Sequence, residues 1–151
     1  MTTHPTYRLH KSIGYQLSVV SRQQERRLDE QLKTIGLTRI TWCVLLAVGN
    51  ENLVHPSEIA EFVGIDRTAT SRALRQMETS GLIARNAGTG DRRMTSVELT
   101  GKGKDLLAKG TPMASSNGKI LAERLGSADL NELYRILAKL RAGEEQPLPR
   151  L

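Results

Sequence analysis

The chain has few of the residues and patterns that mark secreted, membrane or metal-binding proteins. Its single cysteine, Cys43, allows no internal disulfide and fits a reducing compartment. No apolar run approaches the roughly 18–20 residues of a membrane span, and the first residues carry no apolar signal segment. These absences predict a soluble, cytoplasmic protein.

Aromatic residues make up only 3% of the chain, and hydrophobic residues 38%. A core must therefore be built from Leu, Ile, Val and Ala. A polar chain of this size often completes the burial of its apolar surface by pairing with a second copy, so we expect a homodimer.

The motifs of catalysis and metal binding are also missing. His4, His10 and His55 are scattered and no Cys or Glu spacing joins them, so we predict no metal. Gly88-Thr-Gly90 belongs to a turn between two strand-like segments, whereas a nucleotide-binding loop connects a strand to a helix. We therefore predict neither an enzyme nor a bound cofactor.

Positive charge is in excess, and it is segregated along the chain. Lys and Arg total 22 against 16 acidic residues, a net charge of +6. Residues 67–77 hold three arginines and no acid, whereas residues 40–65 hold three glutamates and neither Lys nor Arg. A protein that binds a polyanion needs its positive charges gathered in one region, and this segregation meets that need.

The spacing of apolar residues predicts a mainly α-helical fold with six helices and one small β-hairpin. The first helix spans Ser12 to Ile35. The second, Arg39 to Val48, follows a Thr38 cap and is apolar almost all round, as in a helix buried at the centre of a domain. A third helix begins at Pro56, and a fourth spans Arg67 to Thr79.

A short turn, Gly64-Ile65-Asp66, separates the third and fourth helices, and Asp66 can cap the fourth. Two short helices joined in this way form a helix-turn-helix. Strand-like segments at residues 82–86 and 94–99 flank a turn that begins at Gly88. This hairpin is typical of the wing of a winged helix-turn-helix.

Two further helices are predicted after the hairpin. Thr100 caps the fifth, in which Gly110 and Pro112 should cause a kink or fraying. Ser127 caps the sixth, which carries leucines at helical spacing. The predicted parts are a winged module at residues 36–100, a helical dimerisation region at residues 1–35 and 101–145, and a disordered tail at residues 146–151.

The fourth helix carries the side chains expected to touch DNA, because a helix in the major groove presents mainly its N-terminal residues to the bases. Leu74 and Met77 must face the core. Arginine binds guanine O6 and N7 with two hydrogen bonds, whereas Thr and Ser suit phosphates or a thymine methyl. The predicted DNA-binding residues of this helix are Arg67, Thr68, Thr70, Ser71, Arg72 and Arg75.

The hairpin tip adds Asp91, Arg92 and Arg93. An acid two residues before an arginine can hold that arginine in one direction, which suits insertion into a narrow, electronegative minor groove. We therefore assign Arg93 to the minor groove, Asp91 to orienting Arg93, and Arg92 to a phosphate. The alternative is an ordinary charged hairpin tip.

With these features the chain resembles the MarR family of bacterial transcription regulators, over about residues 12–142. The most specific match is an Asp-x-Arg wing followed by Leu-Thr-x-x-Gly. The matching segments, in the family's order and spacing, are Gly36-Leu-Thr38, Ser57-Glu-Ile-Ala60, Asp66-Arg-Thr-Ala-Thr-Ser-Arg72, Gly81-Leu-Ile83, Asp91-Arg-Arg93 and Leu99-Thr-Gly-Lys-Gly103.

The resemblance implies a homodimer whose first, fifth and sixth helices interlock, with two winged modules on successive turns of a near-palindromic site. It also implies that a ligand or oxidant releases DNA by acting between the dimerisation helices and the winged module. Gly110-Thr-Pro112 departs from the family pattern, in which that helix is continuous.

Four residues are candidates for an effector site that would take an aromatic or anionic ligand: His10, Tyr15, Arg22 and Trp42. Taken singly, Trp42 also fits a core position and the other three fit the surface. Cys43 lies in the most apolar run of the chain, where a thiolate is disfavoured, so we predict a core residue rather than a redox sensor.

The sequence therefore predicts a sequence-specific transcription regulator, a ligand-responsive repressor that binds double-stranded DNA as a homodimer. Two alternatives stay open. One is an architectural DNA-binding protein without an effector, and the other is a winged-helix module that binds a protein partner.

Overall fold

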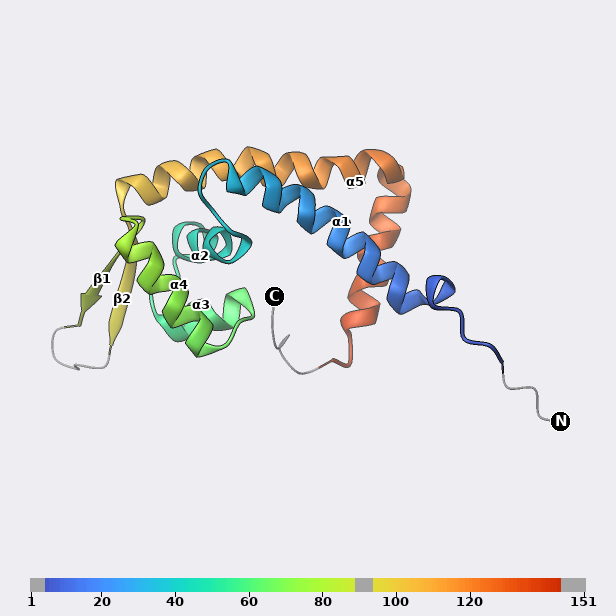
Figure 1. The fold of residues 1–151 in the computed structure, drawn as a ribbon, viewed down its shortest axis with the longest axis horizontal. Coiled ribbons are helices and arrows are strands. Elements are labelled where there is room, and N and C mark those ends of the chain that lie inside the picture. Colours follow the sequence, from blue (N-terminus) through green and yellow to red (C-terminus); the bar gives the residue numbers. More distant parts are fainter. Residues whose placement is uncertain (1–4, 89–93, 145–151) are drawn as a thin grey trace.

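The computed structural model describes residues 5–88 and 94–144. A cluster of short helices with a hairpin at its edge lies beside two long helices, as the ribbon shows (Figure 1). The helices are η1 (Leu9–Lys11, a 3-10 turn), α1 (Ile13–Lys33), α2 (Arg39–Gly49), α3 (Pro56–Val63), α4 (Arg67–Thr79) and α5 (Gly101–Arg141). The strands are β1 (Ile83–Ala87) and β2 (Thr95–Leu99), which pair in antiparallel register from Ile83 opposite Leu99 to Ala87 opposite Thr95.

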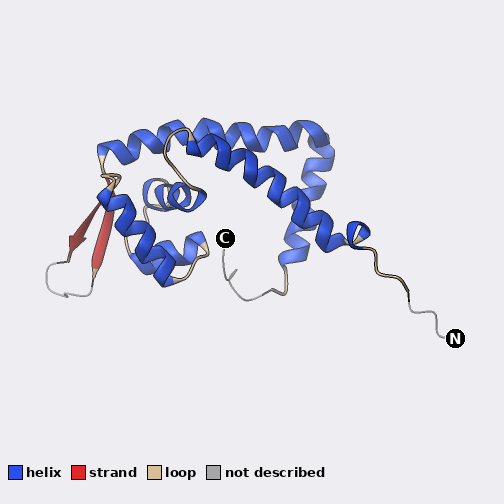
Figure 2. Cartoon of the chain, in the orientation of Figure 1, coloured by secondary structure: helices blue, strands red, loops and turns tan. Residues whose placement is uncertain are grey.

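Figure 2 shows the mainly helical character and the single hairpin that the sequence predicts. The predicted number of six helices is wrong, because the described residues form five α-helices. The segments predicted as a fifth and a sixth helix are one element, α5, which turns at Gly126 (Figure 1). Gly126 has φ 77° and ψ 166°, a conformation that glycine adopts at little cost.

The kink predicted at Gly110 and Pro112 is not found, because α5 continues as a helix through both residues. Gly110 is buried against α2, and a Cβ added there would collide with the Trp42 ring. The glycine therefore permits a close contact between two helices. A glycine inside a helical sequence can mark either a break in the helix or a close crossing of two helices. The sequence alone does not distinguish these two cases.

The core lies around α2, which packs against α3, α4, α5 and β2. Val44, Leu45 and Ala47 have no exposed surface, so the prediction of a central, buried second helix is confirmed. The Thr38 cap is also confirmed, since Thr38 Oγ1 accepts a hydrogen bond from Thr41 N at 3.2 Å. α1 packs against α5, and we call these two helices the arm.

One ion-pair cluster ties the arm to the helices around α2. Arg39, the first residue of α2, pairs with Glu25 at 2.8 Å and with Asp29 at 2.7 Å, both on α1. Glu25 and Asp29 are four residues apart and therefore share one face of α1. The start of α2 is thus fixed to the middle of α1.

Candidate nucleic-acid interface

The exposed face of α4, which lies next to the hairpin, carries three arginines. Arg67, Ser71 and Arg75 are spaced by four residues and form one stripe, and Thr68 and Arg72 form the stripe beside it. All five are exposed. None of the three arginines takes part in an ion pair with another described residue, so their donors are available to an anion.

Local sequence explains how α4 presents this face. Asp66 accepts a hydrogen bond from Ala69 N at 2.7 Å, which confirms it as the N-cap. On the opposite side of the helix Leu74 and Met77 are each 1% exposed and anchor α4 to the core. The amphipathic pattern therefore turns the arginine stripes outward.

Thr70 does not lie on this surface. It is only 1% exposed, and its hydroxyl donates to the Asp66 carbonyl at 2.8 Å, one turn earlier in the chain. Its position on the buried side of α4 follows from its spacing to Leu74 and Met77, at which residues of a helix share a face. A DNA contact through the Thr70 hydroxyl is therefore disfavoured, although the side chain lines the groove described below.

The hairpin is fixed to α4 and α3 by polar contacts. Arg85 on β1 donates to both carboxylate oxygens of Glu78 on α4, at 2.9 and 3.1 Å. This hydrogen-bonded pair lowers the pKa of Glu78 below its ordinary value. His55, the residue before α3, brings Nδ1 within 3.3 Å of the Thr95 carbonyl oxygen on β2. The angle of the hairpin relative to α4 is thus set on two sides.

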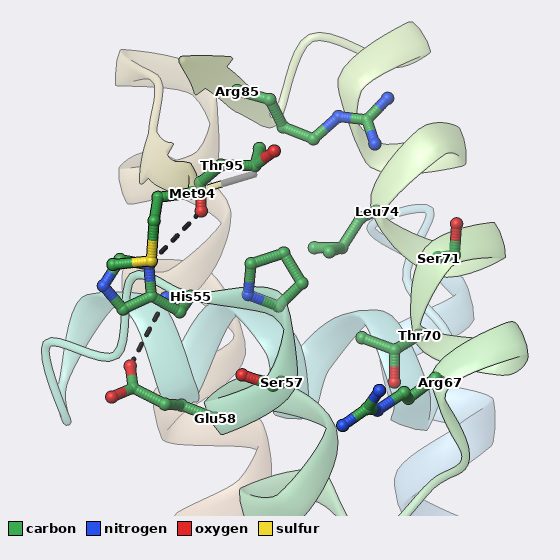
Figure 3. A pocket seen from close by; sticks show the side chains of 11 residues that line it. His55, Ser57, Glu58, Arg67, Thr70, Ser71, Leu74, Arg85, Met94 and Thr95 are labelled. Carbon is green, nitrogen blue, oxygen red and sulfur yellow. Dashed lines mark hydrogen bonds between the residues drawn. The ribbon is translucent and has the colours of Figure 1, made fainter. Parts of the chain in front are cut away.

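A groove of about 420 Å³ lies between the start of α3, α4 and the hairpin, which contributes Arg85, Met94 and Thr95. Figure 3 shows Arg67 and Ser71 on α4 at one side of it, Arg85 on β1 above, and His55 and Met94 at the other side. Arg67, Arg85, the carboxylate of Glu58 and several hydroxyls line this recess, and Arg85 is already paired with Glu78. Arg67 makes no ion pair with a described acid, so it is the cation of the recess that can bind a phosphate.

Sequence reasoning missed Arg85 and the role of His55 in this region. Arg85 sits in a strand-like segment with no motif around it, and the contact of β1 with α4, where Glu78 binds its guanidinium, places it at the groove. His55 is the N-cap residue of α3. Its contact with Thr95 spans 40 residues of sequence. The predicted wing residues Asp91, Arg92 and Arg93 lie outside the described residues.

The comparison with known families addresses this part of the chain. A model of the MarR family matches residues 35–94, from the turn before α2 to the start of β2. We call these matched residues the MarR-family module. They contain the helix-turn-helix of α3 and α4 and the first strand of the hairpin, β1.

Three solved structures share the fold of the MarR-family module and of the arm. A cysteine-to-serine mutant of MarR from E. coli in complex with operator DNA is 22% identical, with a TM-score of 0.77 over 85% of this chain and 92% of that one. BpsR of Bordetella bronchiseptica, whose DNA binding is regulated by 6-hydroxynicotinic acid, is 19% identical, with a TM-score of 0.82 over 92% and 99%. MepR of S. aureus in complex with DNA is 19% identical, with a TM-score of 0.78 over 90% and 99%.

The four residues predicted for an effector site are not brought together. Trp42 is 4% exposed in the core around α2. The rings of His10 and Tyr15 stack at 4.7 Å between η1 and the first turn of α1, and Arg22 is exposed farther along α1. The expectation of a common pocket rested on residue type alone. The positions of these residues on η1, α1 and α2 separate Trp42 and Arg22 from the stacked rings.

Cys43 lies in a setting that disfavours a thiolate. Burial raises the pKa of its thiol above the ordinary value, although the nearby Arg39 lowers it in part. Among the described residues, no group of three His, Cys, Asp or Glu side chains is placed to hold a metal ion. No helix in the described part of the chain is long and apolar enough to cross a membrane.

Proposed function

We propose that this chain is a sequence-specific transcription regulator, a ligand-responsive repressor that binds a near-palindromic operator as a homodimer. The observation that carries the proposal is the arginine-bearing face of α4. It is exposed and capped at its N-terminus, and it lies beside a hairpin held at a fixed angle. A helix with these properties can enter a major groove while the hairpin reaches the flanking backbone.

Each proposed contact follows from side-chain chemistry. Arg67, Thr68, Ser71, Arg72 and Arg75 would contact bases and phosphates from α4. From the wing, Asp91 would orient Arg93 toward the minor groove and Arg92 would contact a phosphate, as the sequence predicts. The module at residues 36–100 would thus carry all the DNA contacts.

The homodimer is supported by apolar side chains exposed on the arm. Ile13 near the start of α1 is 75% exposed, and Tyr134 and Leu140 near the end of α5 are 66% and 54% exposed. Apolar groups of this size in one region mark a surface that a partner covers. Residues 1–35 and 101–145 would therefore form the dimerisation region, and the half-sites would lie about one helical turn, roughly 10 bp, apart.

The test is selection of binding sequences from a random duplex pool at ~150 mM salt, followed by a salt titration on the selected site. A two-fold-symmetric motif with log K falling linearly in log salt is expected. Arg72→Ala should weaken operator binding by about 1–3 kcal/mol and relax specificity at one position. Arg22→Ala, which removes an exposed arginine of α1, is the matched control and should leave binding unchanged.

The two alternative functions give different results in the same experiment. Binding without an enriched motif would favour an architectural protein, and absence of DNA binding would favour a protein-interaction module. Arg92→Ala adds a further check, because loss of a phosphate contact should weaken all sequences alike and make the salt dependence shallower.

A further inference from the structure

The MarR-family module is attached to the arm at two points on one side of α2. Trp42 packs against Gly110 of α5, and Arg39, three residues earlier in α2, reaches α1. Residues three apart in a helix share a face. Residues 34–38 are the only covalent link between α1 and α2 (Figure 1). One contact fixes a position, whereas two contacts also fix an orientation, so Arg39 bears on how the module is turned relative to the arm.

The Arg39 attachment joins one guanidinium to two carboxylates. Its Nη1 lies 2.8 Å from a Glu25 carboxylate oxygen, and its Nε lies 2.7 Å from an Asp29 oxygen. Because the two acids are one turn apart on α1, they hold two nitrogens of a planar, rigid group at different heights along that helix. The ion pairs therefore restrain the direction of α2 as well as its distance from α1.

α1 is a firm support for this attachment because it is hydrogen-bonded to α5. Arg27 Nε on α1 donates at 3.1 Å to Asn117 Oδ1 on α5, and Asn117 is 4% exposed. Glu25 and Asp29 lie two residues before and after Arg27, which places them about 200° around the helix, on the opposite face. One turn of α1 thus contacts α5 on one face and Arg39 on the other. The module is oriented against the arm as a whole.

In a homodimer the arms form the centre, and each α4 is held away from it by its own module. The distance and the angle between the two α4 helices therefore depend on how each module is attached to its arm. One extra base pair between the half-sites moves them apart by about 3.4 Å and turns them by about 35° around the DNA axis. Movement of a module to follow its half-site would pull Arg39 away from the acids of α1.

From this two-point attachment we infer that Arg39, through Glu25 and Asp29, is a positioning residue that sets the half-site spacing the protein accepts. It restricts rotation of the module about the contact between Trp42 and Gly110 and does not itself touch DNA. The inference rests on the proposed function, to which it adds a determinant of operator specificity outside the DNA-binding face. The effect in one module is limited to the strength of the ion pairs, a factor of about 5 or less in affinity.

The test is competition between two duplexes of equal length that carry the same half-sites, one at the selected spacing and one at a spacing one base pair longer. The measured quantity is the ratio of the two affinities. Both duplexes offer the same number of phosphates, so the general salt dependence of DNA binding cancels in this ratio. We expect wild type to favour the selected spacing, and Arg39→Ala to reduce the ratio about 2- to 5-fold. A residue that only stabilised the fold would leave the ratio unchanged.

Three further measurements separate the ion pairs from other effects of the substitution. Arg39→Lys keeps the charge and should recover part of the spacing preference. Glu25→Gln combined with Asp29→Asn removes the acceptor charges without changing α2 and should act like Arg39→Ala. Higher salt should lower the wild-type ratio but not the Arg39→Ala ratio, because only wild type has these pairs to screen.

Arg26→Ala is the matched control. Arg26 pairs with Glu30 at 3.0 Å, but both residues lie on α1, so this pair joins no two elements and its loss should not change the ratio. Equal ratios for wild type and Arg39→Ala, or an equal fall in Arg26→Ala, would overturn the inference. Failure of wild type to bind the paired half-sites at either spacing would contradict the proposed function instead, so the two failures can be told apart.

Discussion

Replacing Gly126 by alanine tests whether the turn in α5 depends on a backbone conformation that glycine alone adopts readily. Gly126 has φ 77° and ψ 166°, and a Cβ added there would meet no other atom within 4 Å. Any cost of the substitution therefore comes from the backbone and not from a collision.

The expected magnitude follows from the conformational preference. A non-glycine residue in this region of φ and ψ costs about 1–3 kcal/mol, and alanine recovers about 0.4–1 kcal/mol by restricting the unfolded chain. With the middle of each range, the net loss of unfolding free energy is about 1.3 kcal/mol. For a chain of this size each kcal/mol lowers Tm by about 2–4 °C.

Gly118→Ala is the matched control in the same helix. Gly118 is exposed, its backbone is helical, and a Cβ there would also meet nothing within 4 Å. Alanine should therefore stabilise the helix by about 0.8–1 kcal/mol. Differential scanning calorimetry at equal protein concentrations should show Tm lowered for Gly126→Ala and raised for Gly118→Ala.

The reasoning would be refuted if Gly126→Ala melted at or above the wild-type temperature. A second readout is shape. If alanine instead adopts helical angles, α5 straightens, and the sedimentation coefficient should fall because the molecule becomes more extended.

Two more outcomes follow from the ion pairs. Arg39→Ala removes the contacts to Glu25 and Asp29 and should lower the unfolding free energy by about 1 kcal/mol or less. Because the lost interaction is electrostatic, the loss measured in urea melts should be smaller in high salt. A loss that salt does not change would contradict this. Hydrogen bonding to Arg85 lowers the pKa of Glu78 in the folded state, so the pair stabilises the fold above the ordinary Glu pKa and loses this effect as pH falls through the lowered value. Glu78→Gln should therefore lower the urea midpoint at neutral pH and change it much less at pH ~3; an equal or larger effect in acid would show that the pair acts otherwise.

Local signals in the sequence were enough to predict most of the helices and strands of the winged module. Thr38 and Asp66 mark helix starts because their side chains accept the free backbone donors there, and the structure shows both hydrogen bonds. The apolar run of α2 predicted its burial, because a helix that is apolar on all sides has no polar face for contact with water.

What the sequence did not yield depends on contacts between distant residues. Gly110 looks like a helix breaker until Trp42 is seen against it. Arg27 and Asn117 are 90 residues apart, and neither belongs to a motif, so their pairing could not be read from spacing. Arg85 reaches the groove only because β1 packs against α4, where Glu78 binds it. In each case the property belongs to a pair of elements and not to one segment.

The close contact between Trp42 and Gly110 also has a spectroscopic consequence. The chain has one tryptophan, and its ring is buried where α2 meets α5. Emission from the unlabelled protein therefore originates at one junction, between the winged module and the arm. A movement of the arm relative to the module would change the polarity around this indole, so tryptophan fluorescence would report that movement without a label.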